Sequence, residues 1–251
     1  MIHGSGPPDV LVLAHQLVGY TTAFAIAPLA LLAFAEPQRH RRWAKTYVCL
    51  MIPLYLTGLY FTFERHAVGS FVWARNLAFN FLGFYFVLLG WRAIWRFRRQ
   101  AIAPTGLDHA LRALLVAASA ALVAMGGLHH FPSFVFGGLG LWLAFAVLRE
   151  TADSRALYLR HQRCMLASFF YVLTVLSIVH FRAPADVKWL WPAVLGLPLV
   201  VYATRPGKPQ ERTRRAVLAS LAIAMVVGVY IAVAATGLVP RLAPAGPLAQ
   251  G

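Results

Sequence analysis

The stretch from Arg160 to Arg182 constrains the fold more than any other part of the sequence. It is an apolar run, RHQRCMLASFFYVLTVLSIVHFR, with His161 near one end and His180 near the other. The two histidines are nineteen positions apart. As an α-helix this separation is roughly 28 Å, which matches a hydrocarbon core of about 30 Å. The stretch therefore predicts a membrane-spanning helix with one imidazole near each water interface.

The composition supports the same class of protein for the whole chain. Of the 251 residues, 60% are apolar and 12% are charged, whereas a soluble domain carries about 25% charged residues. The 23 Lys and Arg residues outnumber 8 acidic residues, but they lie between apolar runs, as the positive-inside rule describes. We therefore expect an integral membrane protein in contact with a lipid bilayer, and no nucleic-acid binding. Cys49 and Cys164 lie in apolar runs and predict no disulfide framework.

The apolar runs predict an all-α polytopic transmembrane helical bundle of about eight spans, forming a single integral membrane domain over residues 1–251. No Lys or Arg precedes Arg39, so the first run is expected to be a retained span and not a signal peptide. Residues 182–251 are expected to add a C-terminal hairpin, in which Pro192 and Pro198 interrupt the seventh span. The predicted spans cover about 10–34, 46–63, 71–95, 109–127, 134–148, 160–182, 187–203 and 216–238.

The distribution of positive charge predicts the orientation. The loops after the first, third, fifth and seventh spans contain 4, 5, 4 and 5 Lys or Arg, with Arg92 and Arg112 counted in the second group, which makes 18 of 23. Such loops face the cytoplasm. We therefore expect both termini on the non-cytoplasmic side of a bacterial cytoplasmic (inner) membrane.

Two segments have a similar pattern. Leu82 and Gly83 lie before Arg92, and Leu139 and Gly140 lie before Arg149 at the same spacing. Helical hairpins repeated in parallel would explain this similarity.

The predicted topology sorts the histidines into two layers. His40, His109 and His161 lie at cytoplasmic span starts, and the others lie on or near the outer side. Intramembrane ionisable residues are functional candidates, and imidazole is an axial ligand of b-type haem in helical bundles. It also binds copper or zinc. We therefore select His15, His129, His161 and His180 as cofactor ligands, and His66 and His130 as metal ligands.

An alternative explanation needs no cofactor. An interfacial histidine can cap a helix end or extend toward the headgroups, and His40 among three arginines equally suits anionic lipid. Asn76 and Asn80 share one helix face and are expected to form interhelical hydrogen bonds, while Arg75 is expected to pair with Glu64. Aromatic residues at span ends indicate interfacial belts, where a quinone could stack without leaving a distinctive spacing.

Three segments together resemble a known family of bacterial membrane proteins. They are His15 in the first span, RHRRWAKTYVCLM entering the second, and RHQRCMLASFFY entering a later span. This arrangement is similar to domain-of-unknown-function family 2306, and covers residues 10–181 in patches. The corresponding positions here are His15, His40 with Arg41, and His161 with Arg163 and Met165. The chain departs from the family pattern at Ala44, where glycine is typical, at Gln162, and in its extra C-terminal spans. The resemblance implies a class of membrane protein and no particular reaction.

Three functions remain open on this evidence. The leading hypothesis is a haem- or metal-binding membrane redox protein that transfers electrons, which requires histidines that face one another. The second is a non-catalytic accessory or assembly subunit of a larger membrane complex, which predicts an apolar flank without a lined cavity. The third is a small-molecule transporter, which predicts a polar cavity near the middle of the membrane. The sequence contains no phosphate-binding loop, dinucleotide fingerprint or nucleophile elbow.

Overall fold

The computed structural model describes residues 10–101, 103–149, 154–181, 185–203 and 209–235. Every regular element in these ranges is helical, so the all-α prediction is confirmed. The elements are α1 (Val10–Thr21), the π-helical turn η1 (Thr22–Ile26), α2 (Ala27–Leu32), the 3₁₀ turn η2 (Ala33–Ala35), α3 (Pro37–Arg65), α4 (Phe71–Arg98), α5 (Gly106–His129), α6 (Phe131–Arg149), α7 (Ser154–His180), α8 (Ala185–Ala203) and α9 (Pro209–Ala235).

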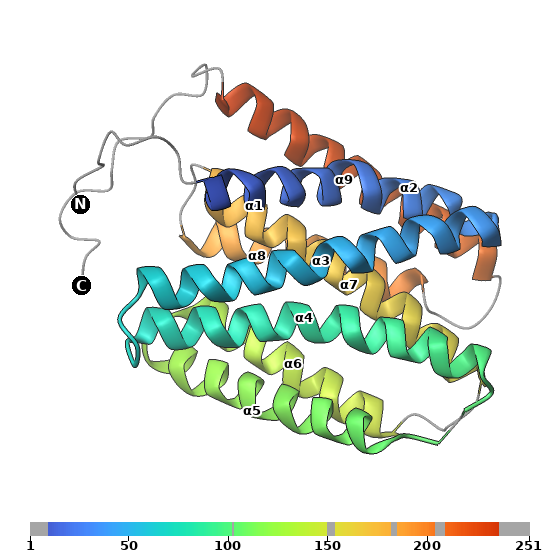
Figure 1. Cartoon of the computed structure of the whole chain (residues 1–251), viewed down its shortest axis with the longest axis horizontal. Coiled ribbons are helices and arrows are strands. Elements are labelled where there is room, and N and C mark those ends of the chain that lie inside the picture. Colours follow the sequence, from blue (N-terminus) through green and yellow to red (C-terminus); the bar gives the residue numbers. More distant parts are fainter. Residues whose placement is uncertain (1–9, 102, 150–153, 182–184, 204–208, 236–251) are drawn as a thin grey trace.

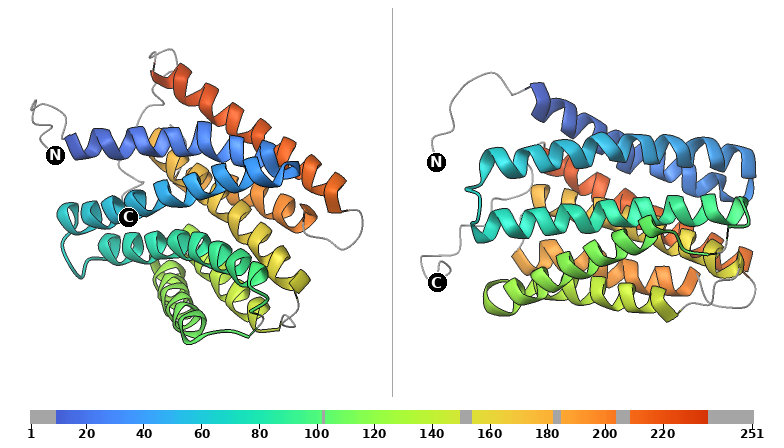
Figure 2. Two further views of the ribbon diagram at one scale, coloured as in Figure 1. Left: turned by 45° about the vertical axis from the view of Figure 1, so that its right-hand side comes forward. Right: turned by 60° about the horizontal axis from the view of Figure 1, so that its bottom comes forward.

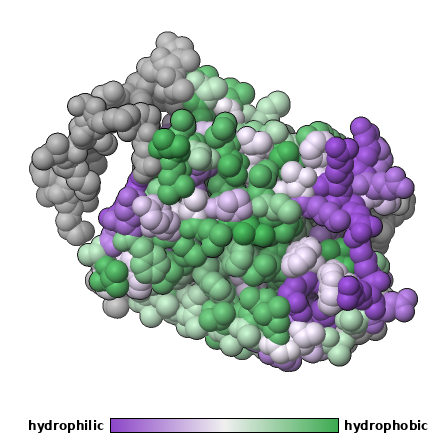
Figure 3. Space-filling view, viewed as in Figure 1, coloured by the Kyte–Doolittle hydropathy of each residue, from purple (hydrophilic) through white to green (hydrophobic). Residues whose placement is uncertain are grey.

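Six helical segments within the described ranges are long and apolar enough to cross a membrane. Two shorter apolar helices, 131–145 within α6 and 187–202 within α8, lie beside them. A wide apolar band covers the visible face of the molecule, and hydrophilic residues gather beyond it at one end (Figure 3). The six segments are Val10–Ala35, Pro37–Arg65, Phe71–Arg98, Gly106–Gly126, Arg155–His180 and Arg214–Val233.

The helices form one elongated bundle whose centre is α4 and α7 (Figures 1 and 2). Of the six long apolar segments, these two have the largest buried share. Helix α7 packs against α4 and α8, the α5–α6 hairpin lies beside α4, and α2 and α3 pack together. The starts of α3, α5 and α7 lie at the same end of the bundle as the end of α4 (Figure 1). We call this the basic end, because Arg39, Arg41, Arg42, Arg96, Arg98 and Arg99 lie there, and the opposite end the outer end.

Three helices begin six or more residues before the predicted span. They are α3 at Pro37, α7 at Ser154 and α9 at Pro209, whereas the spans were predicted to begin at about 46, 160 and 216. Proline is favoured in the first helical turn because its fixed φ suits the helix and its missing N–H is not needed there. The basic segments predicted as loops therefore lie partly inside helices. Pro198 lies inside α8 without ending it, as the lipid environment allows when neighbouring groups satisfy the freed carbonyl.

A π-helical turn interrupts the first span. It covers Thr22–Ile26 and leads directly into Pro28 near the start of α2. Proline lacks the N–H that a regular helix requires, and a π-turn is one way for a helix to absorb such an irregularity. The span then ends in a 3₁₀ turn before Glu36, which brings the backbone of Ala30 close to the start of α3.

Polar contacts and close packing hold the central helices in register. The Tyr171 hydroxyl on α7 donates to the Phe79 carbonyl oxygen on α4 at 2.9 Å. Gly83 on α4 lies against the same tyrosine, because a Cβ placed there would be 2.3 Å from the Tyr171 ring. At the basic end, the Arg92 Nε donates to Asp108 Oδ1 at 2.7 Å, which joins α4 to α5.

Candidate functional site

The described histidines fall mainly into two cavities at opposite ends of the bundle. His40 and His161 line a cavity of about 560 Å³ at the basic end. His15, His66 and His180 line a cavity of about 490 Å³ at the outer end. The two cavities share no lining residue, so they are separate candidate sites.

At the basic end, the rings of His40 and His161 are in T-shaped contact. Their ring centroids are 6.3 Å apart and the ring planes meet at 82°. His40 Nδ1 lies 2.9 Å from the carbonyl oxygen of Ala30, and His161 Nδ1 lies 2.9 Å from that of Gly90. A carbonyl oxygen only accepts hydrogen bonds, so Nδ1 carries the proton in both rings. When each ring is neutral, its Nε2 therefore presents a lone pair.

The rest of this cavity is apolar and basic. Trp91, Trp95, Tyr158 and Met165 provide aromatic and thioether surface. The polar part consists of three cations and one amide, and no Asp or Glu is among the described lining residues. The cations are Arg41, Lys45 and Arg98. A group that enters this cavity therefore meets two imidazole nitrogens, apolar walls and positive charge.

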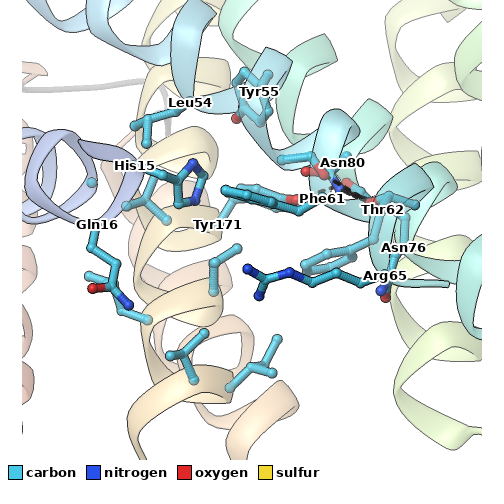
Figure 4. Close-up of a pocket in the computed structure, with 18 of the residues that line it drawn as sticks. His15, Gln16, Leu54, Tyr55, Phe61, Thr62, Arg65, Asn76, Asn80 and Tyr171 are labelled. Atoms are coloured by element: carbon cyan, nitrogen blue, oxygen red, sulfur yellow. Dashed lines mark hydrogen bonds between the residues drawn. The ribbon is translucent and has the colours of Figure 1, made fainter. Parts of the chain in front are cut away.

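The outer cavity is lined by α1, α3, α4, α7 and Trp189 of α8, and Figure 4 shows its labelled side chains. His15 extends into it from α1, and the guanidinium group of Arg65 extends into it from α3 (Figure 4). His15 Nδ1 lies 2.6 Å from Thr57 Oγ1. Because the Thr57 hydroxyl donates its hydrogen to the Pro53 carbonyl at 2.7 Å, it accepts from Nδ1, which leaves the His15 Nε2 lone pair without a partner in the described residues.

His180 lines the outer cavity on the side of α1. Its Nε2 lies 2.5 Å from the Tyr20 hydroxyl, and the two rings are in tilted contact with centroids 5.5 Å apart. This nitrogen is therefore already engaged by a protein group. His66, at the turn after α3, also lines the cavity.

Two arginines line the outer cavity without an acidic partner in the described part of the chain. Arg75 contacts the Asn76 amide oxygen at 3.3 Å and lies over the rings of Phe71 and Trp189. Arg65 lies over Phe61. The predicted pairing of Arg75 with Glu64 is therefore wrong, because the aromatic rings and the amide hold the guanidinium group instead.

The part of the outer cavity that lies deepest in the bundle contains polar groups with hydrogen-bond partners and one without a partner in the described residues. Asn80 donates from Nδ2 to the Thr62 hydroxyl at 3.3 Å and to the Asn76 carbonyl at 2.9 Å, so the predicted interhelical hydrogen bond is confirmed for Asn80. The Tyr55 hydroxyl has no hydrogen-bond partner among the described residues, although the side chain is only 5% exposed. Tyr55 is thus the clearest unexplained polar group of this cavity.

The structure separates the predicted cofactor ligands. His161 and His180 lie near opposite ends of α7 and in different cavities. His15 shares a cavity with His180 and His66. His130 contacts Ser133 at 3.0 Å and lies beside the Trp189 ring, while the side chain of His129 lies outside the described residues. Among the described side chains, no group of three or more His, Cys, Asp or Glu is placed to hold a metal ion.

Sequence reasoning did not select His40 as a ligand. Its signal was present, because it lies at the basic end of its predicted span, next to arginines, as His161 does. Its three arginine neighbours indicated an interfacial role, and only the structure shows the contact with His161.

Comparison of the chain with protein-family models, with curated proteins and with solved structures found no match.

Proposed function

We propose that the protein is a membrane redox protein that binds haem through His40 and His161. The observation that carries this proposal is the shared geometry of the two rings. Each Nδ1–H is fixed by a backbone carbonyl at 2.9 Å, and the two rings lie beside each other in one cavity. A hydrogen bond of this kind is the usual partner of a metal-bound histidine, because it fixes the tautomer and orients the ring.

The separation of the rings fits a shared metal atom. A metal–imidazole bond is about 2.0 Å long, which places each ring centroid roughly 3 Å from the metal. The observed distance between centroids is 6.3 Å. The donor set also suits iron in haem better than zinc, because structural zinc takes four protein ligands and no group of three is present among the described residues.

The cavity around the pair fits the rest of the haem group. Its aromatic and aliphatic side chains would contact an apolar macrocycle. Arg41, Lys45 and Arg98 line the same cavity and would pair with anionic propionate groups. When bound, haem would supply one-electron transfer, with the two imidazoles and their hydrogen bonds setting the potential.

The alternative of an accessory subunit has less support. It predicted an apolar flank without a lined cavity, whereas the described residues line cavities at both ends of the bundle. A transporter would need access from both sides, and the two cavities are separate. The redox proposal gives a direct role to the two imidazoles that backbone carbonyls hold in one cavity.

We also propose the finer topology that the charges predict. In this topology α6 and α8 complete about eight spans, the basic end faces the cytoplasm of a bacterium, and both termini lie on the other side. The resemblance to domain-of-unknown-function family 2306 is part of this proposal. The adjacent placement of His40 and His161 supports it, because both belong to the motifs that carry the resemblance.

The test is the haem content of the full-length protein in matched histidine variants. His40→Ala and His161→Ala are each expected to lower haem per protein at least tenfold. His109→Ala is the control, because His109 is an exposed histidine at the start of α5 at the same end. Full haem content in both of the first two variants would refute the assignment.

A further inference from the structure

The outer cavity has the size of a ring with its substituents. Its volume is about 490 Å³, and a water-sized group takes roughly 30 Å³, so roughly 16 non-hydrogen atoms fit inside. It is lined by five helices and is partly open. A membrane protein with such a cavity can take a ligand from the lipid phase.

The walls favour a planar ligand. Rings from five helices line the cavity, and they include Tyr20, Phe61, Phe79, Tyr171 and Trp189. Aromatic rings associate with other π-systems by stacking and by edge-to-face contact. The surface is thus better matched to a flat ring than to a sugar or a compact ion.

The charge of the lining excludes cationic ligands. Arg65 and Arg75 line the cavity, and none of the described lining residues is acidic. The predicted outer side has only 5 of the 23 Lys and Arg residues, and two of these five line this cavity. Because cations in a membrane protein are costly and scarce on this side, their presence here favours a ligand with electron-rich oxygens.

The inner end of the cavity argues against a simple acyl chain. Tyr55 lies ten positions before Arg65 on α3, which is about 15 Å along the helix axis. Its buried hydroxyl lacks a partner in the described residues, and a buried polar group is unfavourable until it is hydrogen-bonded. An acyl chain offers no acceptor at this depth, whereas a carbonyl oxygen on a ring does.

We propose that the outer cavity binds the ring of a lipid-soluble quinone. The Tyr55 hydroxyl donates to one ring oxygen of the oxidised form. The unpaired lone pair of His15 Nε2, on the facing helix (Figure 4), accepts from a hydroxyl of the reduced form. The aromatic walls hold the ring, and the positive charge of the two arginines nearer the opening favours an electron-rich ligand over a cation. This site is separate from the His40–His161 pair, so its test does not depend on whether the protein binds haem.

The experiment measures binding of a 1,4-benzoquinone with a ten-carbon tail to the detergent-purified full-length protein by isothermal titration calorimetry. Tyr55→Phe removes the hydroxyl and keeps the ring. It is expected to weaken binding about fivefold, as the loss of one net hydrogen bond does. Tyr60→Phe is the matched control, because Tyr60 is 50% exposed on the same helix and does not line the cavity. Binding to this control should equal that of the unchanged protein.

Two further measurements separate the outcomes. The thermal stability of Tyr55→Phe should not fall, because the hydroxyl bonds to no described protein group. Decanoate, a fatty acid of similar length, should bind at least tenfold more weakly than the quinone. The proposal is overturned if the quinone shows no saturable binding, if Tyr55→Phe binds as tightly as Tyr60→Phe, or if decanoate binds as well as the quinone. Haem content, recorded on the same samples, reports separately on the proposed redox function.

Discussion

His40 and His161 come from different helices and lie with their ring centroids 6.3 Å apart at the basic end of the bundle. The backbone determines this arrangement, because the Ala30 carbonyl holds one ring and the Gly90 carbonyl holds the other. The irregular end of the first span presents the first carbonyl, and the central helix α4 presents the second. Four segments of the chain must therefore pack correctly to form the pair.

Gly90→Ala tests the support of His161 by the backbone. A Cβ at this position would lie 2.9 Å from Met165 Sδ and 3.1 Å from Cys164 Cβ, so the Met165 side chain must move and the backbone near Cys164 must give way slightly. Because supporting contacts typically change metal affinity 10–100-fold, we expect haem affinity to fall about tenfold. Gly138→Ala, which meets nothing within 4 Å, is the control, and haem titration of both variants is the measurement. Equal affinities would show that this packing does not position His161.

Asp108→Asn tests the ion pair that joins α4 to α5. The side chains of Asp108 and Arg92 are 5% and 15% exposed, and their atoms are 2.7 Å apart. Removing one charge of a buried pair leaves the other uncompensated, which costs about 3 kcal/mol of stability. Thermal unfolding in detergent measures the loss.

Glu211→Gln is the control for Asp108→Asn. The Glu211–Arg215 pair is exposed on the surface of α9, where an ion pair contributes less than about 1 kcal/mol. Asp108 also lies 3.6 Å from Arg96, so a loss of stability in Glu211→Gln as large as that in Asp108→Asn would contradict the special role of the buried Asp108 contacts.

Gly83→Ala tests the packing of the two central helices. Its added Cβ would lie 2.3 Å from the Tyr171 ring, which also donates a hydrogen bond to the Phe79 carbonyl. Overpacking of this kind costs about 1–3 kcal/mol, so we expect a lower unfolding temperature. Gly138→Ala should have unchanged or slightly raised stability, since alanine is the better helix former. A stable Gly83→Ala variant would mean that α4 and α7 can separate freely.

The orientation can be measured with single cysteines in a background that lacks Cys49 and Cys164. One cysteine replaces Val68 in the exposed turn between α3 and α4, and the other replaces Gln38 at the exposed start of α3. The charge distribution places the first outside and the second in the cytoplasm. A membrane-impermeant thiol reagent applied to intact cells should label residue 68 and label residue 38 only after permeabilisation. The opposite pattern would invert the proposed topology.

The helices were largely predictable from the sequence, because an apolar run bounded by charged residues has few alternatives to a helical conformation in a bilayer. The first span was predicted for 10–34 and is observed over 10–35. The start of α3 was missed because the apolar run begins later than the helix. Its first turns are basic and extend beyond the apolar run, where hydropathy gives no signal.

The two cavities were only partly predictable. The histidine layers followed from spacing along each helix, but their partners depend on how the helices pack. The Ala30 carbonyl is available to His40 because the first span ends irregularly, and no sequence pattern indicated this. Tyr55 resembled any other aromatic residue of an apolar span, and only the structure shows that its hydroxyl lacks a partner among the described residues.

The most direct test of the central claim is the absorption spectrum of the purified full-length protein, oxidised and then reduced with dithionite, with iron analysis of the same sample. If His40 and His161 bind haem, a Soret band will be present, will shift on reduction, and will accompany about one iron per chain. A spectrum of protein absorption alone, without stoichiometric iron in protein purified from cells supplied with haem, would contradict the account.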